Sequence, residues 1–194
     1  RKLSPADLFR VLRDHYEDTQ YRQDNPPHDS GHYGAGGPIC NRYTNSGSIF
    51  QLRKSLPVEI GTVWWLALGR PCSTPFVPLY PGALREVPPE LAFEAAGDTL
   101  TAEDERKQPD KALSLVLRWN RLVDADYKAK SGECVTQSLA FENGVFKDQK
   151  ENESRAVKHW NESPDKALES LRDFSLKSLN KWSDLVKSWS DGKP

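Results

Sequence analysis

The hydrophobic and polar positions along the chain predict a helix, then sheet strands, then a run of helices. Near the start, apolar residues recur at helical spacing after Ser4, a good N-cap, and Pro5, which suits the first helical position. These signals predict a helix that begins after Ser4 and ends near Asp18. Residues 24–38 are rich in glycine and proline, which is typical of a loop.

The middle of the chain carries the pattern of strands. Residues 39–44 and 48–53 flank Asn45-Ser46-Gly47, a turn sequence that can supply positive φ angles, so we expect a β-hairpin that ends before Pro57. Residues 62–68 are rich in β-branched and aromatic side chains and are apolar on both faces, which predicts a strand covered on both sides. Trp64 and Trp65 are therefore interpreted as core and facing layer.

Two polar or proline-rich stretches follow. Residues 71–89 contain many prolines and should be mostly extended loop. Residues 75–81 cannot form a central strand, because proline donates no hydrogen bond to a sheet. Residues 94–110 are polar, and we expect them to be exposed.

The last third has helical periodicity. One helix is expected over about residues 109–128 and a second over about residues 133–160, with a break near Gly144. A third should begin at Pro164, after Ser163 as N-cap, and end at Gly192.

Together these elements predict the α+β class, with helices at both ends of the chain around a mainly antiparallel sheet. The 194 residues are expected to form one unit, in which residues 1–90 supply a helix and the sheet and residues 91–194 are mainly helical. Because the sequence begins at Arg1 and contains no Met, we expect a part of a larger protein.

Charge excludes some classes of partner. The net charge is -1, with 27 basic and 28 acidic residues, so no overall field draws the chain to nucleic acid or to an anionic membrane. No apolar run approaches the roughly 20 residues that span a bilayer. The compartment stays open, with the cytoplasm slightly favoured.

The three cysteines give no sign of a metal or disulfide framework. Cys40, Cys72 and Cys134 are odd in number, far apart and without CxxC spacing, so we interpret them as buried free thiols. His28 and His32, with Asp24 and Asp29, resemble metal ligands only loosely. The preferred interpretation there is a solvated loop, and no metal or cofactor is expected.

His15 and Glu17 are candidates for a general base and its orienting carboxylate. On a helix these positions lie about 200° apart, so they can pair only if the helix has ended. From spacing alone, the favoured alternative is a histidine that caps carbonyl groups at the helix C-terminus. Asn45 is either a turn residue or an amide that donates to an oxyanion.

Three segments together resemble the cysteine dipeptidases related to secernins. Residues 13–19 (RDHYEDT) resemble that family's R-x-H-Y-E-G-T, with Asp18 in place of glycine. Residues 44–57 resemble its hairpin. Residues 60–80 (IGTVWWLALGRPCSTPFVPLY) are the closest match.

The resemblance implies an N-terminal-nucleophile hydrolase with an αββα sandwich. An N-terminal cysteine attacks the peptide carbonyl, its own α-amine serves as the base, and no metal is needed. Substrates are dipeptides or small peptides with a free N-terminus. None of the three cysteines starts the chain, so we expect the nucleophile in a missing N-terminal part, which leaves no catalytic residue in this C-terminal part.

By the same resemblance, six residues are candidates for the substrate pocket: His15, Tyr16, Glu17, Thr19, Thr44 and Asn45. Polar groups near Asn45 would support an oxyanion or the substrate amine, and Glu17 would balance a substrate ammonium. An equally weighted alternative is that residues 15–17 only tie the helix to the sheet.

Two alternative functions stay open. The chain is either a noncatalytic binding or scaffolding module derived from the same family, or part of another small-amide acylase. A bare fragment of this kind is expected to associate through exposed apolar surface, as a homo-oligomer or with its missing N-terminal part.

Overall fold

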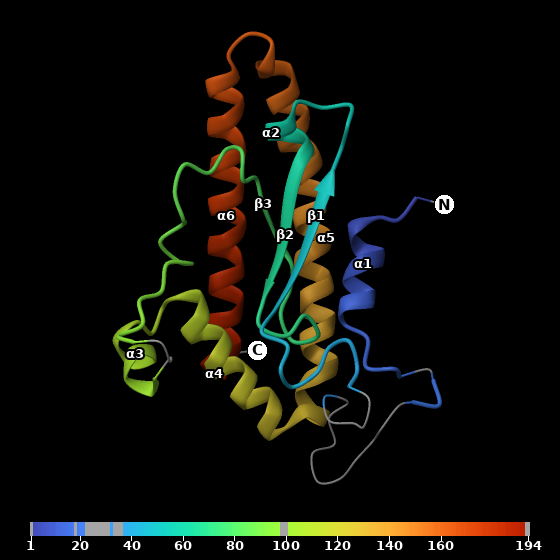
Figure 1. Ribbon diagram of the computed structural model, residues 1–194, viewed down its shortest axis with the longest axis vertical. Coiled ribbons are helices and arrows are strands. Elements are labelled where there is room, and N and C mark those ends of the chain that lie inside the picture. The colour runs from blue at the N-terminus through green and yellow to red at the C-terminus, as the bar shows by residue number, and fades with distance from the viewer. Residues whose placement is uncertain (1, 18, 22–31, 33–36, 98–100, 193–194) are drawn as a thin grey trace.

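The computed structural model describes residues 2–17, 19–21, 32, 37–97 and 101–192, and it confirms the α+β class. The elements in order are α1 (Pro5–Leu12), β1 (Ser46–Leu52), α2 (Val58–Gly61), β2 (Thr62–Leu68), β3 (Val77–Leu79), α3 (Ala102–Lys107), α4 (Ala112–Ala125), α5 (Tyr127–Trp160) and α6 (Pro164–Ser190). The two long helices α5 and α6 run side by side along the sheet, while α1 lies beside β1 (Figure 1).

The sheet is antiparallel, with the strand order β1-β2-β3. Ile49 of β1 pairs with Trp65 of β2, and Trp65 pairs on its other side with Pro78 of β3. Pro78 thus lies on an edge strand, as the proline rule requires. A mainly antiparallel sheet is present as the sequence predicts, but the short strand β3 belongs to it although residues 71–89 are expected to be mostly loop.

The predicted hairpin around Asn45 is wrong. Residues 39–44 form no strand, and β1 instead pairs with β2. Asn41 explains the difference, because its side-chain oxygen accepts from the Tyr43 N–H at 2.8 Å and its carbonyl from the Thr44 N–H at 3.0 Å. These local bonds hold the backbone in a turn that competes with a strand.

Both faces of β2 are covered, as its apolar sequence predicts. One face presents Val63 and Trp65 to a core that includes Phe9 of α1 and Val145 of α5. The opposite face presents Leu66 to a second core, with side chains from α4 and α6. Toward β1 this second face opens: Phe50 is 59% exposed and stacks on the partly buried Trp64.

Helix α1 ends earlier than the sequence predicts. It begins at Pro5 behind a capping box of Ser4 and Asp7, but it ends at Leu12 and not near residue 18, which itself lies outside the described residues. Tyr16 has a φ of 64°, a value that a right-handed helix cannot accommodate. Residues 13–17 therefore turn away from the helix axis, and this turn builds the site.

The C-terminal helices differ from the prediction in three places. Helix α3 lies in a stretch expected to be only polar and exposed, and its Thr101–Asp104 capping box is the missed signal. Helix α5 begins at Tyr127 and continues unbroken through Gly144, since one glycine costs only about 1 kcal/mol in a helix that is otherwise well packed. Helix α6 begins at Pro164 as predicted and ends just before Gly192.

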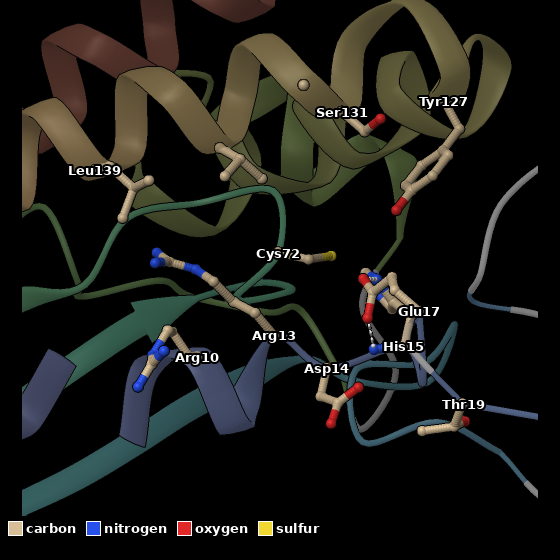
Figure 2. Close-up of a pocket in the computed structure, with 12 residues that line it drawn as sticks. Arg10, Arg13, Asp14, His15, Glu17, Thr19, Cys72, Tyr127, Ser131 and Leu139 are labelled. Carbon is tan, nitrogen blue, oxygen red and sulfur yellow. Dashed lines mark hydrogen bonds and ion pairs between the residues drawn. The ribbon is translucent and has the colours of Figure 1, made fainter. Parts of the chain in front are cut away.

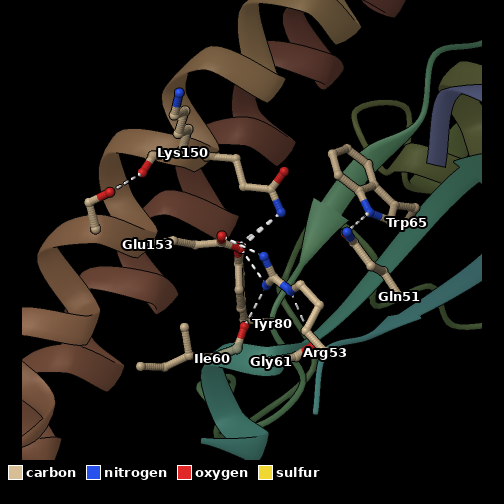
Figure 3. Close-up of polar contacts among 10 residues, drawn as sticks. Gln51, Arg53, Ile60, Gly61, Trp65, Tyr80, Lys150 and Glu153 are labelled. Atoms are coloured by element: carbon tan, nitrogen blue, oxygen red, sulfur yellow. Dashed lines mark hydrogen bonds and ion pairs between the residues drawn. The ribbon is translucent and has the colours of Figure 1, made fainter. Parts of the chain in front are cut away.

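A polar network ties the sheet to α5 (Figure 3). The Arg53 guanidinium donates to both Glu153 oxygens, at 2.6 and 2.5 Å, and to the Ile60 carbonyl at 2.7 Å. The Tyr80 hydroxyl donates to the same carboxylate and accepts from Gln149 at 3.1 Å. Burial and the Glu153 charge raise the pKa of Tyr80, so it stays a neutral donor.

Among the described residues, no helix is long and apolar enough to cross a membrane.

Candidate active site

A pocket of about 760 Å³ lies between the turn that follows α1 and the first half of α5 (Figure 2). The turn supplies its charged wall and α5 supplies a largely apolar wall. The lining residues are Arg10, Arg13, Asp14, His15, Glu17, Thr19, Cys72, Tyr127, Ser131, Gly132, Val135 and Leu139.

Arg13 fixes one side of this pocket. Its guanidinium makes two parallel bonds to Glu142 of α5, at 3.0 and 2.5 Å, and its Nε donates to the Pro71 carbonyl at 2.8 Å. The same Glu142 carboxylate accepts from the backbone N–H of Phe76 at 2.8 Å. Three chain segments are thus joined at one largely buried ion pair.

The turn after α1 brings His15 and Glu17 together. Asp14 Oδ1 accepts from the Tyr16 N–H at 2.6 Å, and Glu17 accepts from the His15 N–H at 2.9 Å. The His15 Nδ1 also lies 2.9 Å from Glu17 Oε1, while its Nε2 is buried and has no hydrogen-bond partner among the described residues. Because α1 ends before His15, the side chains of His15 and Glu17 can pair. His15 therefore does not cap the carbonyl groups at the C-terminus of the helix, which is the alternative that its spacing favours.

His15 belongs to a buried cluster of two histidines and two cysteines. One nitrogen from His15, one from His32 and the sulfurs of Cys40 and Cys72 all lie within 4.8 Å of one another, and all four residues are buried. His32 Nε2 is 3.0 Å from Cys72 Sγ, and its Nδ1 is 3.2 Å from an Arg70 nitrogen. The prediction of a solvated loop is therefore wrong for His32, whereas His28, Asp24 and Asp29 lie outside the described residues.

Comparison with known proteins shows which family this chain belongs to. Residues 1–132 match the model of Peptidase family C69, a match that includes all four members of the cluster and Tyr127 of the pocket. The chain belongs to peptidase family C69. This confirms the dipeptidase resemblance at the level of the family.

One curated relative of this C69 chain is the "Probable dipeptidase B" of Streptococcus pyogenes serotype M1. It is 42% identical over 45 residues. That stretch is 23% of this chain and 9% of the relative, so the match spans only a small part of the relative's length.

The six candidates from the sequence separate in space. His15, Glu17 and Thr19 line the pocket. Tyr16, Thr44 and Asn45 are not among its lining residues.

Each of these three has a hydrogen bond elsewhere instead. Tyr16 donates to the Gly37 carbonyl at 3.4 Å, Thr44 Oγ1 accepts from the Asn41 N–H at 3.0 Å, and the Asn45 carbonyl accepts from the Gly69 N–H at 2.9 Å. The last two contacts shape the entry to β1.

Sequence reasoning missed other members of the site. Arg10, Arg13 and Asp14 line the pocket, although the candidates that the sequence indicates in this region begin only at His15. Cys72 and Tyr127 come from segments far along the chain, and no spacing in the sequence relates them to His15. Only the density of charged residues in positions 10–17 could have pointed to this wall.

The residues of the cluster shift the pKa values of one another in different directions. The neighbouring Cys72 thiol and the two histidines lower the pKa of Cys40, while burial and the Cys40 charge raise the pKa of Cys72. Burial opposes protonation of His15, but Cys40 and Glu17 outweigh it and raise the pKa of that histidine. Burial lowers the pKa of His32. The arrangement therefore favours one thiolate, on Cys40, beside a histidine that a carboxylate orients.

Proposed function

We propose that this C69 chain is the C-terminal portion of a cysteine dipeptidase, in which it forms one wall of the substrate pocket. Substrates are dipeptides or small peptides with a free N-terminus. The attacking group is an N-terminal cysteine that belongs to a part of the protein outside this chain. The observation that carries the proposal is the pocket beside the turn that follows α1, because the two sides of this pocket carry opposite charges.

The charges of the pocket suit a small zwitterion. Asp14 and Glu17 place carboxylates on one side, whereas Arg10 places a guanidinium on the other (Figure 2). A dipeptide carries an ammonium and a carboxylate at its two ends, so it can orient between these groups through charge-assisted hydrogen bonds. Val135 and Leu139 of α5 supply apolar surface for its side chains.

The cysteines within the chain are poor candidates for this nucleophile. The mechanism implied by the resemblance uses a free α-amine as the base, and an internal cysteine has an amide instead. The Cys40 amide donates to the Asp14 carbonyl at 3.1 Å, and Cys134 lies inside α5. All three sulfurs belong to buried residues. These features support a nucleophile from elsewhere.

The open part of the sheet supports a place for the remaining protein. Phe50 and Leu52 of the edge strand β1 are 59% and 73% exposed, on the face that Trp64 shares. An αββα sandwich needs a second sheet against the first. We propose that the missing N-terminal part covers this face.

The test compares the isolated chain with the complete protein that contains it. Release of amino acids from an unmodified dipeptide is measured for both, before and after alkylation of the N-terminal cysteine of the complete protein. We expect hydrolysis only by the complete, unalkylated protein. Robust cleavage by the isolated chain would place the nucleophile within it, and no cleavage by the complete protein would favour a noncatalytic module.

A further inference from the structure

We propose that His15, Cys40, Cys72 and His32 form a binding site for a soft divalent transition metal of the zinc class. The resemblance to cysteine dipeptidases implies no metal, so this site would be additional to the hydrolytic chemistry. The inference does not depend on the proposed function, because its test measures metal binding and not hydrolysis.

The donor set and its compactness point to this class of ligand. Two sulfurs and two imidazole nitrogens are the set that zinc prefers in closed, four-coordinate sites. With bonds of about 2.0–2.3 Å, tetrahedral donors lie roughly 3.3–3.8 Å apart. The four donor atoms here lie within 4.8 Å of one another, so the most distant pair must approach by about 1 Å.

His15 is already oriented as a metal ligand. Its Nδ1 is held by the Glu17 carboxylate at 2.9 Å, which leaves Nε2 as the free donor. That nitrogen is buried without a hydrogen-bond partner among the residues described, an arrangement that normally has a cost. A carboxylate that orients a histidine is the usual second shell of a zinc site, and a metal at Nε2 would satisfy the free nitrogen.

His32 is the weakest of the four ligands. Arg70 lies 3.2 Å from His32 Nδ1, and a guanidinium only donates, so Nδ1 accepts and the proton of the neutral ring lies on Nε2, toward Cys72. Metal binding at Nε2 requires this proton to leave and Nδ1 to take one up, which displaces Arg70. Arg70 retains Asp124 at 2.6 Å and the Asn120 carbonyl at 3.1 Å, so it keeps partners after this shift.

Two thiolates would balance the charge of the ion. The two sulfurs and His15 would be the strongest ligands of the ion, and His32 would be the fourth ligand. His15 and Cys72 also line the pocket, so the ion would lie at the pocket wall and would hold the turn after α1 against the segment that follows β2. Metal binding should thus stabilise the fold, because the four ligands come from separate segments of the chain.

The test uses Co²⁺ as a spectroscopic probe on the reduced, metal-free chain, followed by competition with Zn²⁺. We expect one Co²⁺ per chain, a thiolate-to-cobalt charge-transfer band and tetrahedral d–d bands, all lost when one equivalent of Zn²⁺ is added. Absence of the thiolate band in the intact, reduced chain would overturn the proposal.

Variants assign the ligands. C40S and C72S should each abolish the thiolate band or reduce it by half or more, and H15A should weaken binding at least about 10-fold. E17Q, which changes only the partner of His15, should weaken binding about 10–100-fold. H32A should weaken binding less than H15A does.

The matched control is C134S, since Cys134 is the remaining buried thiol and lies outside the cluster. It should bind Co²⁺ as the wild type does, and circular dichroism should confirm that each variant is folded. If a folded C40S/C72S double variant keeps the thiolate band, or if C134S loses it, the assignment of these ligands is wrong.

Discussion

At the scale of the residue, Gly69 shows how one position allows the sheet to pack closely against α4. It ends β2 with a φ of 77°, and its N–H donates to the Asn45 carbonyl at 2.9 Å. A Cβ at this position would lie 2.4 Å from Val116 Cγ1 of α4. The sequence predicts a strand end here, but the close approach of α4 could not be predicted, because it depends on packing between distant segments.

We therefore predict that G69A destabilises the fold by about 2–4 kcal/mol, from backbone strain at positive φ and from overpacking against Val116. The measurement is the free energy of unfolding in urea. The control is G144A in α5, where a Cβ meets nothing within 4 Å. It should stabilise the chain by roughly 0.5–1 kcal/mol. Equal stability of the two variants would contradict this account.

At the scale of the element, capping and hydrophobic periodicity predicted the structure correctly where no side-chain hydrogen bond to the backbone competed with them. The start of α6 and the strand Thr62–Leu68 follow from capping and from the apolar pattern. The end of α1 and the partner of β1 did not follow. The positive φ of Tyr16 and the turn at Asn41 are set by side-chain hydrogen bonds that periodicity does not report.

The ion pair between Arg13, at the C-terminal end of α1, and Glu142 of α5 gives a prediction at this scale. E142Q should cost about 3–5 kcal/mol in unfolding free energy, because it leaves the Arg13 charge buried without a counterion and weakens the bond to Phe76. Chemical denaturation measures this cost. The exposed pair of Lys107 and Glu103 offers the control, and E103Q should change stability by no more than about 0.5 kcal/mol. A similar small effect for E142Q would show that the pair does not hold these helices.

At the scale of the whole molecule, the site is assembled from the turn after α1, from His32, Cys40 and Cys72, and from α5. The resemblance located the first of these, and residues 15, 17 and 19 do line the pocket. The cluster of cysteines and histidines could not be predicted from the sequence, because its members have no diagnostic spacing. Only the fold brings them within 4.8 Å of one another.

Metal linkage can be measured at this scale. Zinc should raise the melting temperature of the reduced chain, and at a free concentration 100-fold above Kd the gain in stability should be about 2.7 kcal/mol. A chelator should reverse the gain, and C40S should remove it while C134S keeps it. A zinc-induced gain that persists in C40S/C72S would place the ion at other residues.

We propose that this C69 chain forms the wall that recognises the free N-terminus of a dipeptide. The most direct test is kcat/KM of the complete protein for a dipeptide and for its N-acetylated form, in the wild type, in E17Q and in the exposed control E86Q. We predict that E17Q loses about 10–100-fold on the free dipeptide, the size of a charge-assisted hydrogen bond, and that E86Q matches the wild type. If E17Q leaves the preference for the free N-terminus unchanged, the chain does not read the substrate in this way.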